Sequence, residues 1–382
     1  MKKQCECKNG DVLFKGYKDL FKISSDEKFT TKGGDLFACK TCGLIQKKVN
    51  ANFKKKINLI YNNYSAYPLT NGNENLITIN DKNFFRSDIV INHINKNVLK
   101  LKKKKILDIG CGSGFTLKRI SHLYPDNKLF AHDYDKKEIK KIKEIKNFED
   151  FYTGNINKIK NKFDLIILMH VFEHVERPIN FLNILKKKLT PNGVICIQSP
   201  NIERNFLDIL TYDHICHFSK TSLKFLLSKT LFFRGKFFNL LKKEITCVVY
   251  NCNDKKKTKN YLNKFKIKNK IKNFQKKINK INNFKNHAQK LSEKNSKSLI
   301  SIFGTTVPSI WIANEIGLKN IHNFFDEDKF KIGKKILKKK IVFPRHIKKN
   351  SILIFPCINK LAKEITKRYQ NLDGSLKSFS QV

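Results

Sequence analysis

Three glycines at alternate positions follow a short apolar run and precede a helical pattern. The stretch K-I-L-D-I-G-C-G-S-G-F at 105–115 carries Asp108 and then Gly110, Gly112 and Gly114. Glycine has no Cβ, so it accepts positive φ and lets a ligand lie against the backbone. The following helix offers free N–H groups to a polar ligand. The stretch predicts a binding turn between a strand and a helix, and its spacing is not the G-x-G-x-x-G of a dinucleotide site.

Polar side chains also follow the next two strand-like runs. Asp133 ends the run 128–132, where a carboxylate can accept hydrogen bonds from both ribose hydroxyls of a nucleoside; Asp135 is the alternative, and we expect it to face solvent. Asn155 follows the run 151–153 and Gly154, where a polar side chain can meet an adenine amino group. Ligands of open α/β sheets bind at the carboxyl ends of the strands, so we expect these residues to share one crevice with the glycines.

Two groups of histidines could carry acid–base chemistry. The first follows the apolar run F-D-L-I-I-L-M at 163–169, which is typical of a buried parallel strand. It comprises His170 and His174, with Glu173 between them, and we expect it to face the same crevice.

The second group lies in T-Y-D-H-I-C-H-F-S at 211–219. His214 follows Asp213, which can fix the tautomer of its ring, and we predict His214 as a general base. His217 lies beside Phe218 and is predicted to be a packed core residue. A metal site made of Asp213, His214 and His217 is the alternative, but the sequence offers no further ligand for it.

Tyrosines and cysteines cluster before the glycine stretch. Tyr61, Tyr64 and Tyr67 lie on a predicted loop that precedes a helix expected at 82–99, and together they could line a lid over a substrate; any one of them could equally be buried. Further upstream, two cysteine pairs suit a structural zinc ion with four thiolate ligands, Cys5, Cys7, Cys39 and Cys42. The first pair departs from the usual C-x-x-C spacing, and free thiols are the alternative. No thioredoxin-like unit surrounds the second pair, which argues against a redox motif.

The elements that must position these residues alternate between strands and helices along the chain. With 382 residues, we expect two or three domains, and the class is α/β. Residues 179–189 predict a helix and 194–198 a strand, within a Rossmann-like domain at 105–253. The full predicted order is a cysteine module at 1–50, a lid segment at 51–104, the domain at 105–253, a basic helix at 254–297 and a small Rossmann-like domain at 298–370 that binds no dinucleotide.

The net charge of +46 invites a nucleic-acid interpretation. The excess is nearly all Lys, spread along the chain among many Asn, Ile and Phe residues, which is typical of AT-rich codon usage. Arg, which suits phosphate better, is scarce. The Lys-rich helix at 254–297 keeps an apolar stripe, so we favour a linker packed on a neighbouring domain over a membrane-surface or RNA-binding helix. The chain shows neither an apolar leader nor an apolar run of about 18 residues, so we expect a cytoplasmic protein with reduced thiols.

The motifs D-x-G-C-G-S-G, F-D-L-I, E-H-V and P-x-G resemble class I S-adenosylmethionine (SAM) methyltransferases. With its flanking parts, nearly the whole chain resembles the sugar C-methyltransferases that act on nucleotide-linked keto-deoxysugars. The resemblance implies a zinc module, a SAM-binding domain and a Rossmann-like domain that follows it. It also implies SAM as cofactor, a nucleotide sugar as substrate, and Asp108, Gly110, Gly112, Gly114, Asp133, Asn155 and His170 as cofactor-binding residues.

That family carries a motif Y-H-E-H-x-x-Y-F-S, whose final histidine is the proposed base. Laid on this chain, the base falls on His214, the glutamate on Asp213 and the tyrosine on Thr211. A family histidine falls on His174, and a family tyrosine on Tyr64 or Tyr67. Thr211 cannot act as a phenol, so the resemblance leaves carbon or oxygen as the methylated atom open. An RNA methyltransferase and a degenerate binding module are further alternatives; the Arg-poor composition argues against the first, and the intact glycine turn and Asp133 against the second.

Overall fold

The computed structural model describes residues 5–7, 10–74, 76–79, 82–230, 233–251, 264–295, 299–346, 351–356, 359–370 and 377–379. The chain forms two compact units. Unit 1 comprises 1–12, 37–208 and 214–268, and unit 2 comprises 13–36, 209–213 and 269–382. Residues 254–263 of the predicted basic helix and Ser298 lie outside the described residues. The five-part division expected from the sequence stays a prediction.

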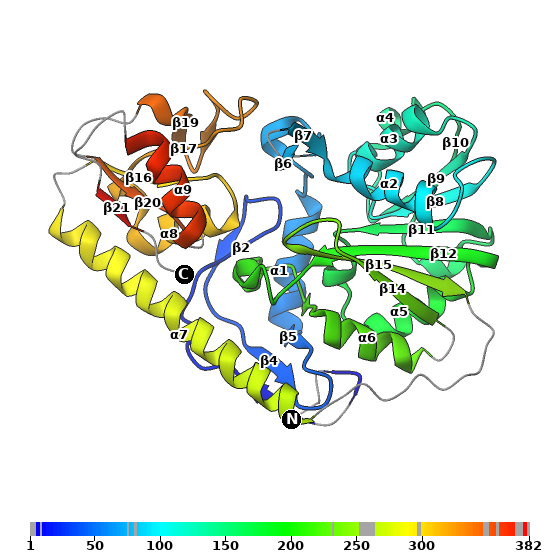
Figure 1. The fold of residues 1–382 in the computed structure, drawn as a ribbon, viewed down its shortest axis with the longest axis horizontal. Coiled ribbons are helices and arrows are strands. Elements are labelled where there is room, and N and C mark those ends of the chain that lie inside the picture. Colours follow the sequence, from blue (N-terminus) through cyan, green and yellow to red (C-terminus); the bar gives the residue numbers. More distant parts are fainter. Residues whose placement is uncertain are drawn as a thin grey trace. The chain divides into compact units, whose positions relative to one another are not determined.

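Unit 1 is built on a seven-stranded sheet in the order β10-β9-β8-β11-β12-β15-β14 (Figure 1). Its strands are β8 (Lys105–Ile109), β9 (Lys128–Asp133), β10 (Phe148–Thr153), β11 (Phe163–Met169), β12 (Leu189–Pro200), β14 (Phe233–Phe238) and β15 (Glu244–Asn251). The first five strands pair in parallel, and β15 runs antiparallel to β12 and β14. After β8 the chain forms β9 and β10 on one side of β8, and then returns to form β11 on the opposite side of β8. The switch point, where such sheets bind ligands, therefore lies between β8 and β11.

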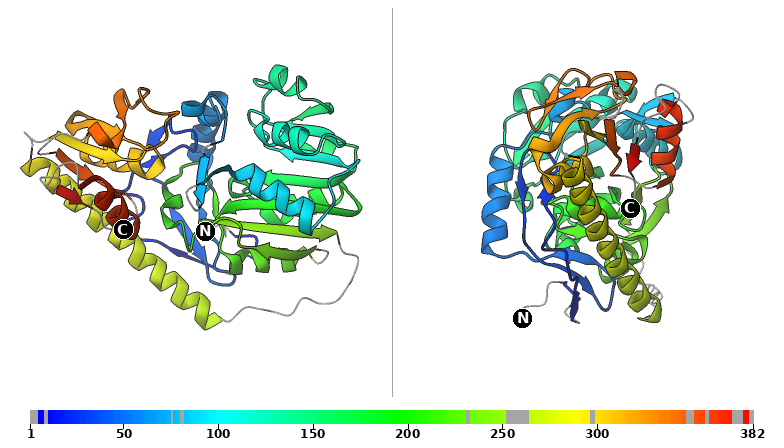
Figure 2. Two further views of the ribbon diagram at one scale, coloured as in Figure 1. Left: turned by 45° about the horizontal axis from the view of Figure 1, so that its top comes forward. Right: turned by 90° about the vertical axis from the view of Figure 1, so that its left-hand side faces the viewer.

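Helices cover both faces of this sheet (Figures 1 and 2). They are α2 (Arg86–Asn97), α3 (Phe115–Leu123), α4 (Ile139–Lys143), α5 (Pro178–Lys186) and α6 (Lys220–Lys229). Apolar side chains of α2 and α3 form one core with the β8, β11 and β12 side chains, including Val90, Ile91, Leu117, Leu165 and Val194. Ser219 caps α6 in a capping box with Ser222.

Two boundaries differ from the sequence prediction. The segment expected as a helix from 82 begins as β7 (Lys82–Phe85), which pairs with β6 (Leu76–Ile79), and α2 starts only at Arg86. Glu74 accepts hydrogen bonds from N and Oγ of Ser87 at that start, so a side chain distant in sequence fixes the boundary. Strand β12 begins at Leu189 and runs through the turn expected at 190–193. A Cβ on Gly193 would come within 2.7 Å of the Phe163 carbonyl, so this glycine permits close strand packing.

Shorter elements precede the sheet of unit 1 or connect its strands. They are α1 (Ala51–Asn62), β5 (Ile45–Lys47), β13 (Cys216–His217) and the 3₁₀ turns η1 (Pro68–Thr70), η2 (Ile156–Lys158), η3 (Phe172–His174) and η4 (Phe206–Leu210). A small sheet has the order β1-β4-β5-β13, with β1 at Asp11–Leu13 and β4 at Leu36–Cys39. Within it, β13 pairs with β5, so the chain just after His214 is part of a sheet.

Unit 2 contains a sheet in the order β18-β19-β17-β16-β20-β21. Its elements are α7 (Lys264–Lys294), β16 (Leu299–Phe303), α8 (Val307–Ile316), η5 (Leu318–Asn320), β17 (Ile321–Phe325), β18 (Lys335–Ile336), β19 (Lys339–Val342), η6 (Pro344–His346), β20 (Ser351–Ile354), α9 (Asn359–Gln370) and β21 (Lys377–Phe379), with the hairpin β2 (Lys22–Ile23) and β3 (Thr30–Thr31). The apolar stripe of α7 is buried, and Phe274 and Phe284 contact the rings of Phe14 and Trp311. The stripe packs on protein, as the linker interpretation expects.

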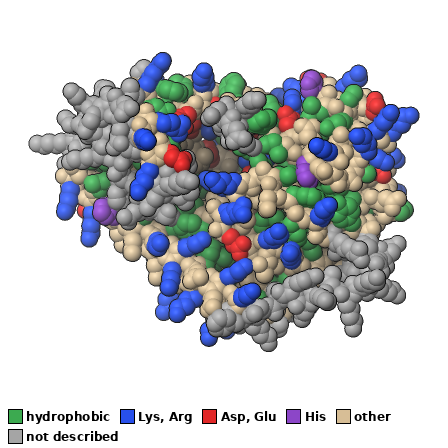
Figure 3. Space-filling model, in the orientation of Figure 1, with side chains coloured by type: hydrophobic (Ala, Val, Ile, Leu, Met, Phe, Trp, Pro, Cys, Tyr) green, Lys and Arg blue, Asp and Glu red, His purple; other side chains and the backbone are tan. Residues whose placement is uncertain are grey.

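Lys and Arg side chains are distributed over the face shown in Figure 3 and do not gather in one patch. Within the part of the chain that the structure describes, no helix has the length and apolar character needed to span a membrane. The positive charge is thus a general property of this surface.

An aromatic stack holds the loop after β11 in place. Phe172 and Phe218 are fully buried, and their ring centroids lie 4.9 Å apart with the planes nearly parallel. Phe172 precedes Glu173 and His174, so the stack fixes both relative to β13 and α6. Contact between buried rings contributes beyond the area that it removes from water.

We expect Phe172→Ala to lower the free energy of unfolding by about 3–5 kcal/mol, because it leaves a large cavity beneath these residues. Urea unfolding followed by circular dichroism measures the change. Phe84→Ala is the control, since that ring is 39% exposed and its loss should cost little. Equal midpoints for the two variants would show that the stack does not hold this loop.

Candidate active site

The glycine turn lies at the switch point of the main sheet. Gly110, Gly112 and Gly114 have φ values of +66°, +52° and +75°, a region that other residues enter only with strain. A Cβ on Gly110 would meet Cγ2 of Val171 at 2.6 Å, so the ends of β8 and β11 touch here. The turn feeds directly into α3, as the sequence predicted.

Three carboxyl groups surround this turn. Asp108 is buried under it, and burial together with the nearby Asp133 and Glu74 raises its pKa well above the usual value. Asp133 accepts hydrogen bonds from N of Gly112 at 2.7 Å and from N of Tyr134 at 2.6 Å. Such a set of acids favours a cationic ligand and disfavours a pyrophosphate. Glu74 was not predicted from the sequence, because it lies in a loop with no recognisable motif, but its charge acts on Asp108 beneath the turn.

The segment 61–73 lies against the same turn. Oγ of Ser113 donates a hydrogen bond to the Gly72 carbonyl at 2.6 Å, and a Cβ on Gly112 would be 3.2 Å from Cβ of Ala66. Tyr67 and Asn71 have φ values of +52° and +53°, unusual for non-glycine residues and typical of functional loops. The predicted lid segment is therefore adjacent to the cofactor turn.

His170 stands between two glutamates at the end of β11. Its Nδ1 lies 3.1 Å from Oε1 of Glu173, and its Nε2 lies 3.4 Å from Oε2 of Glu244. Burial and Arg86 act to lower its pKa, but the two carboxylates outweigh them and raise the pKa of His170 to about 9. His170 is thus an imidazolium at neutral pH, and its φ of +55° marks a constrained backbone.

Arg86 continues this buried network. Its Nε lies 2.9 Å from Oε1 of Glu244, and its Nη1 donates to the hydroxyl of Tyr67 at 3.2 Å. Burial opposes the ionised form of Glu244, but Arg86 and His170 together lower its pKa to about 2. Glu173 is fully buried with a lowered pKa, because its histidine neighbours outweigh the cost of burial. Unpaired charges would be costly here, so the network fixes its members as a unit.

The two predicted catalytic histidines meet beside Glu173. The rings of His174 and His214 lie 4.7 Å apart and nearly perpendicular, and one atom of each lies within 4.8 Å of the Glu173 carboxylate. Nδ1 of His174 is 3.1 Å from the hydroxyl of Tyr61. Tyr61, Tyr64 and Tyr67 were predicted together as lid residues, with Tyr64 or Tyr67 as the tyrosine implied by the resemblance. It is Tyr61, on α1, whose hydroxyl lies beside His174, and Tyr64 contacts the ring of Tyr61 edge-on.

The hydrogen-bond partner of the His214 ring is Asp208 and not the predicted Asp213. The carboxylate of Asp208 meets Nδ1 of His214 at 2.8 Å and Nδ1 of His217 at 2.7 Å. The neighbouring Asp213 was expected to hold His214, but it belongs to unit 2, where its carboxylate accepts hydrogen bonds from N and Oγ of Ser25. Asp213 lies in a turn, so its side chain and that of the next residue, His214, meet different partners.

Other predicted positions have partners of their own. Oδ1 of Asn155 accepts a hydrogen bond from N of Asn157 and caps the turn η2. In unit 2, Thr211 forms a bridge with Ile23, and the ring of Tyr212 lies near Phe29. The predicted adenine contact of Asn155 and the substrate roles of Tyr64 and Tyr67 stay predictions.

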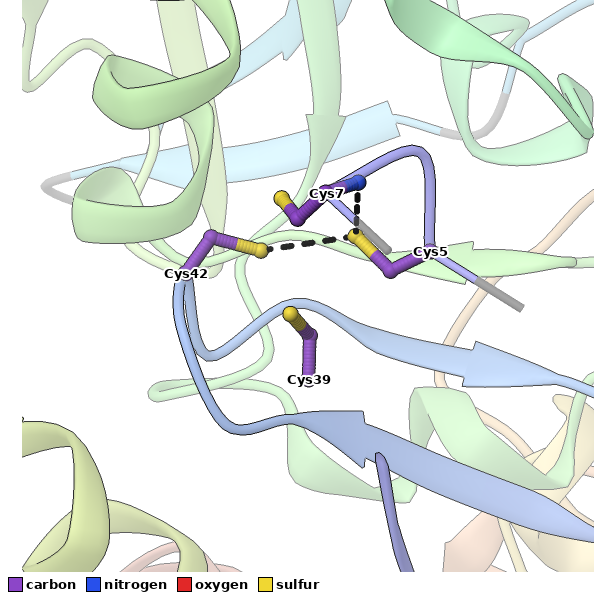
Figure 4. A group of neighbouring side chains, drawn as sticks. All are labelled: Cys5, Cys7, Cys39 and Cys42. Atoms are coloured by element: carbon purple, nitrogen blue, oxygen red, sulfur yellow. Dashed lines mark hydrogen bonds between the residues drawn. The ribbon is translucent and has the colours of Figure 1, made fainter. Parts of the chain in front are cut away.

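The four N-terminal cysteines converge (Figure 4). Their sulfur atoms all lie within 4.8 Å of one another, and Cys5 and Cys42 are 3.6 Å apart. Tetrahedral zinc with bonds of about 2.3 Å needs sulfurs about 3.8 Å apart, so the set fits this ion. Gly43, at φ +69°, donates its N–H to the Cys39 carbonyl and closes the loop.

Comparisons with known proteins agree with this geometry. Residues 86–230 match the family model described as a methyltransferase domain. The chain is 31% identical over 121 residues to the mitochondrial ubiquinone biosynthesis O-methyltransferase of Schizosaccharomyces pombe, covering 29% of this chain and 44% of that one. It is 25% identical over 128 residues to a tRNA U34 carboxymethyltransferase of Pseudoalteromonas atlantica, covering 31% and 39%. The chain thus spans less than half the length of these curated relatives.

Among solved structures, a SAM-dependent methyltransferase from Aquifex aeolicus aligns with a TM-score of 0.37 and 21% identity, over 44% of this chain and 90% of that one. The family match rests on the same stretch that carries the glycine turn and both groups of histidines. Residues 86–230 thus match a methyltransferase domain in sequence, and they carry most of the α/β, Rossmann-like sheet described above.

Proposed function

We propose that this protein transfers the methyl group of SAM to a carbon of a nucleotide-linked keto sugar, with His214 as the general base. The observation that carries the proposal is the meeting of His214, His174 and Glu173 at the end of β11, the strand that touches the glycine turn. A methyl donor bound at the turn would lie near an acid–base group. Methyl transfer to a carbon requires such an acid–base group, because a proton must first leave that carbon.

The need for a base follows from the chemistry of methyl transfer to carbon. When bound, SAM supplies a methyl group on a sulfonium that is already activated, so the protein must mainly align and desolvate the acceptor. A sugar carbon becomes nucleophilic only after a proton α to a ketone is removed. That step requires a base within hydrogen-bond reach and a donor for the enolate oxygen.

The described residues can fill both roles. His214 accepts the α proton, and His174, supported by the hydroxyl of Tyr61, donates a hydrogen bond to the enolate oxygen. Glu173 favours the imidazolium that forms when His214 takes the proton. Tyr64 and Tyr67 remain our proposed lid residues, and the acceptor sugar is the substrate implied by the resemblance.

The acids around the glycine turn favour SAM as the cofactor. SAM brings a sulfonium and an ammonium, and Asp133 and Glu74 place carboxyl groups beside the turn in a chain of strongly positive net charge. We assign the ribose hydroxyls to Asp133, the adenine to Asn155, and the methionine carboxylate to the imidazolium of His170. Gly110, Gly112 and Gly114 keep the turn open to the ligand.

Methylation of a hydroxyl on a small molecule is the second candidate. Curated relatives are named as ubiquinone biosynthesis O-methyltransferases, although the match covers only part of them. A hydroxyl acceptor needs a base but no enolate donor, so His214 would serve there as well. The two candidates differ in whether a carbon-bound proton must leave.

We further propose that Cys5, Cys7, Cys39 and Cys42 hold a structural zinc ion. Four thiolates leave no open position for catalysis, and the ion would tie the N-terminal residues to the loop between β4 and β5.

Gly112→Val should lower the affinity for SAM by more than about tenfold, equivalent to about 1.4 kcal/mol. A branched side chain at φ +52° strains the turn and collides near Ala66. Gly333→Val is the matched control, because Gly333 also has positive φ but faces open space in unit 2. Calorimetry that finds the same SAM affinity in Gly112→Val as in the native protein would refute the assignment of the turn.

Purified protein should contain about one zinc ion per chain. Cys39→Ser should lower the zinc content and the thermal stability while leaving SAM affinity intact, and metal analysis by mass spectrometry measures the first effect. Cys247→Ala is the control, since that thiol is buried in β15 away from the cluster. Freshly prepared, unchelated native protein without zinc would contradict the proposal.

His214→Ala should reduce turnover by roughly 10²–10⁴, the usual contribution of a positioned base, with SAM affinity nearly unchanged. In the native protein, activity should rise with pH as the imidazole loses its proton, because only the neutral ring accepts one. His322→Ala is the control, because it removes an exposed histidine of β17.

The same base should exchange the α proton of a keto sugar with deuterated water when a non-reactive SAM analogue is bound. Mass spectrometry of the recovered sugar measures the exchange. His214→Ala should abolish it; exchange that persists in this variant would move the base to another residue.

A further inference from the structure

We infer that Asp208 is the positioning residue of His214: it selects the tautomer of the ring and holds the charge that the ring acquires. The inference rests on the proposed function of His214 as the base. No sequence motif marks Asp208, which lies six residues upstream in the 3₁₀ turn η4.

The hydrogen bonds define the proton positions. Burial opposes the charge of Asp208, but His214 and His217 outweigh it and hold the pKa of this carboxyl well below its usual range. An ionised carboxylate can only accept hydrogen bonds. Both histidines approach it through Nδ1, at 2.8 and 2.7 Å, so both Nδ1 atoms carry a proton. In neutral His214 the proton-accepting atom is therefore Nε2.

His217 keeps the carboxylate from rotating. It occupies the second oxygen of Asp208 from β13, which is paired with β5. Burial and Lys47 lower the pKa of His217 to about 4, so this ring stays neutral and adds no charge beside the base. His217 was predicted to be a packed core residue; its ring is indeed buried, and it also holds Asp208 by a hydrogen bond.

Among the described residues, several charged and titratable groups lie near His214. They are Asp208 on η4, Glu173 and His174 on η3, His217 on β13 and Lys47 on β5. Lys47 donates from Nζ to the backbone carbonyl of His214 at 2.8 Å. Two carboxylates thus face the ring, and both favour its protonated form. Loss of Asp208 should make His214 harder to protonate.

The first test needs no substrate. In protein labelled with nitrogen-15 in its histidine rings, the His214 resonances are assigned by their absence in His214→Gln. We expect the neutral ring to carry its proton on Nδ1. A neutral ring protonated on Nε2 would overturn the inference, whatever the enzyme methylates.

The second test uses Asp208→Asn, whose amide can no longer accept from both histidines through equivalent oxygens. We expect turnover to fall by about 10²–10⁴ with little change in SAM affinity. The acid limb of the activity profile should move to lower pH, because the carboxylate that favoured the imidazolium is gone. If Asp208 only stabilised the fold, Asp208→Asn would lower the activity by lowering the amount of folded protein, and the acid limb of its activity profile would stay at the native pH.

Asp164→Asn is the matched control. Asp164 also accepts two hydrogen bonds, from Lys105 N and Thr190 Oγ1, but lies at the opposite end of β11. The acid limb of the activity profile of Asp164→Asn should match that of the native protein. An unshifted limb in folded Asp208→Asn would refute the inference; if that variant does not fold, the ring resonances of the native protein decide. A protein that carries the Nδ1 tautomer but methylates nothing would refute the proposed function and leave the positioning of His214 intact.

Discussion

The edge of the main sheet depends on the pairing of buried carboxylates. Asp108, Glu74, Glu173 and Asp208 are buried and Asp133 and Glu244 are half-buried, in a chain whose net charge is +46. A buried charge is tolerated only when it is paired and hydrogen-bonded. Each ionised member accordingly has defined partners: backbone N–H groups for Asp133, Ser87 for Glu74, Arg86 and His170 for Glu244, and two histidines for Asp208.

These pairings divide the edge into two regions. Around the glycine turn, the acids leave a negative environment suited to a cation. Around the end of β11, carboxylates and imidazoles alternate and are suited to moving a proton. His170, held as an imidazolium, contacts both Glu173 and Glu244 at the end of β11. One buried network can thus serve cofactor binding and acid–base chemistry at neighbouring positions.

Local patterns predicted the fold well. Apolar runs gave the strands β8, β9 and β11, and the glycine spacing gave the turn into α3, because these signals depend on a few adjacent residues. The start of α2 at Arg86 was missed because Glu74 reaches it from another loop. The early start of β12 was missed because Gly193 looks like a turn residue but lies against β11 in the fold.

The site was predicted less completely, because several of its contacts join residues that are distant in sequence. His174 and His214 stood out by residue type, and they do meet. Asp208 did not stand out, because it lies in a 3₁₀ turn with no periodic pattern. Tyr61 was predicted only as one of three lid tyrosines, because it lies on α1, more than a hundred residues before the His174 that it contacts. Asp213 was chosen for adjacency in sequence, whereas the actual partner is set by how the chain turns back.

The central claim is that this edge forms an enolate before a methyl group arrives. The most direct measurement is the product formed from a nucleotide-linked keto sugar and SAM labelled with carbon-13 in its methyl group. We predict a new one-bond carbon–carbon coupling between the labelled methyl and a ring carbon next to the ketone. A labelled methyl attached through oxygen, without that coupling, would contradict the account.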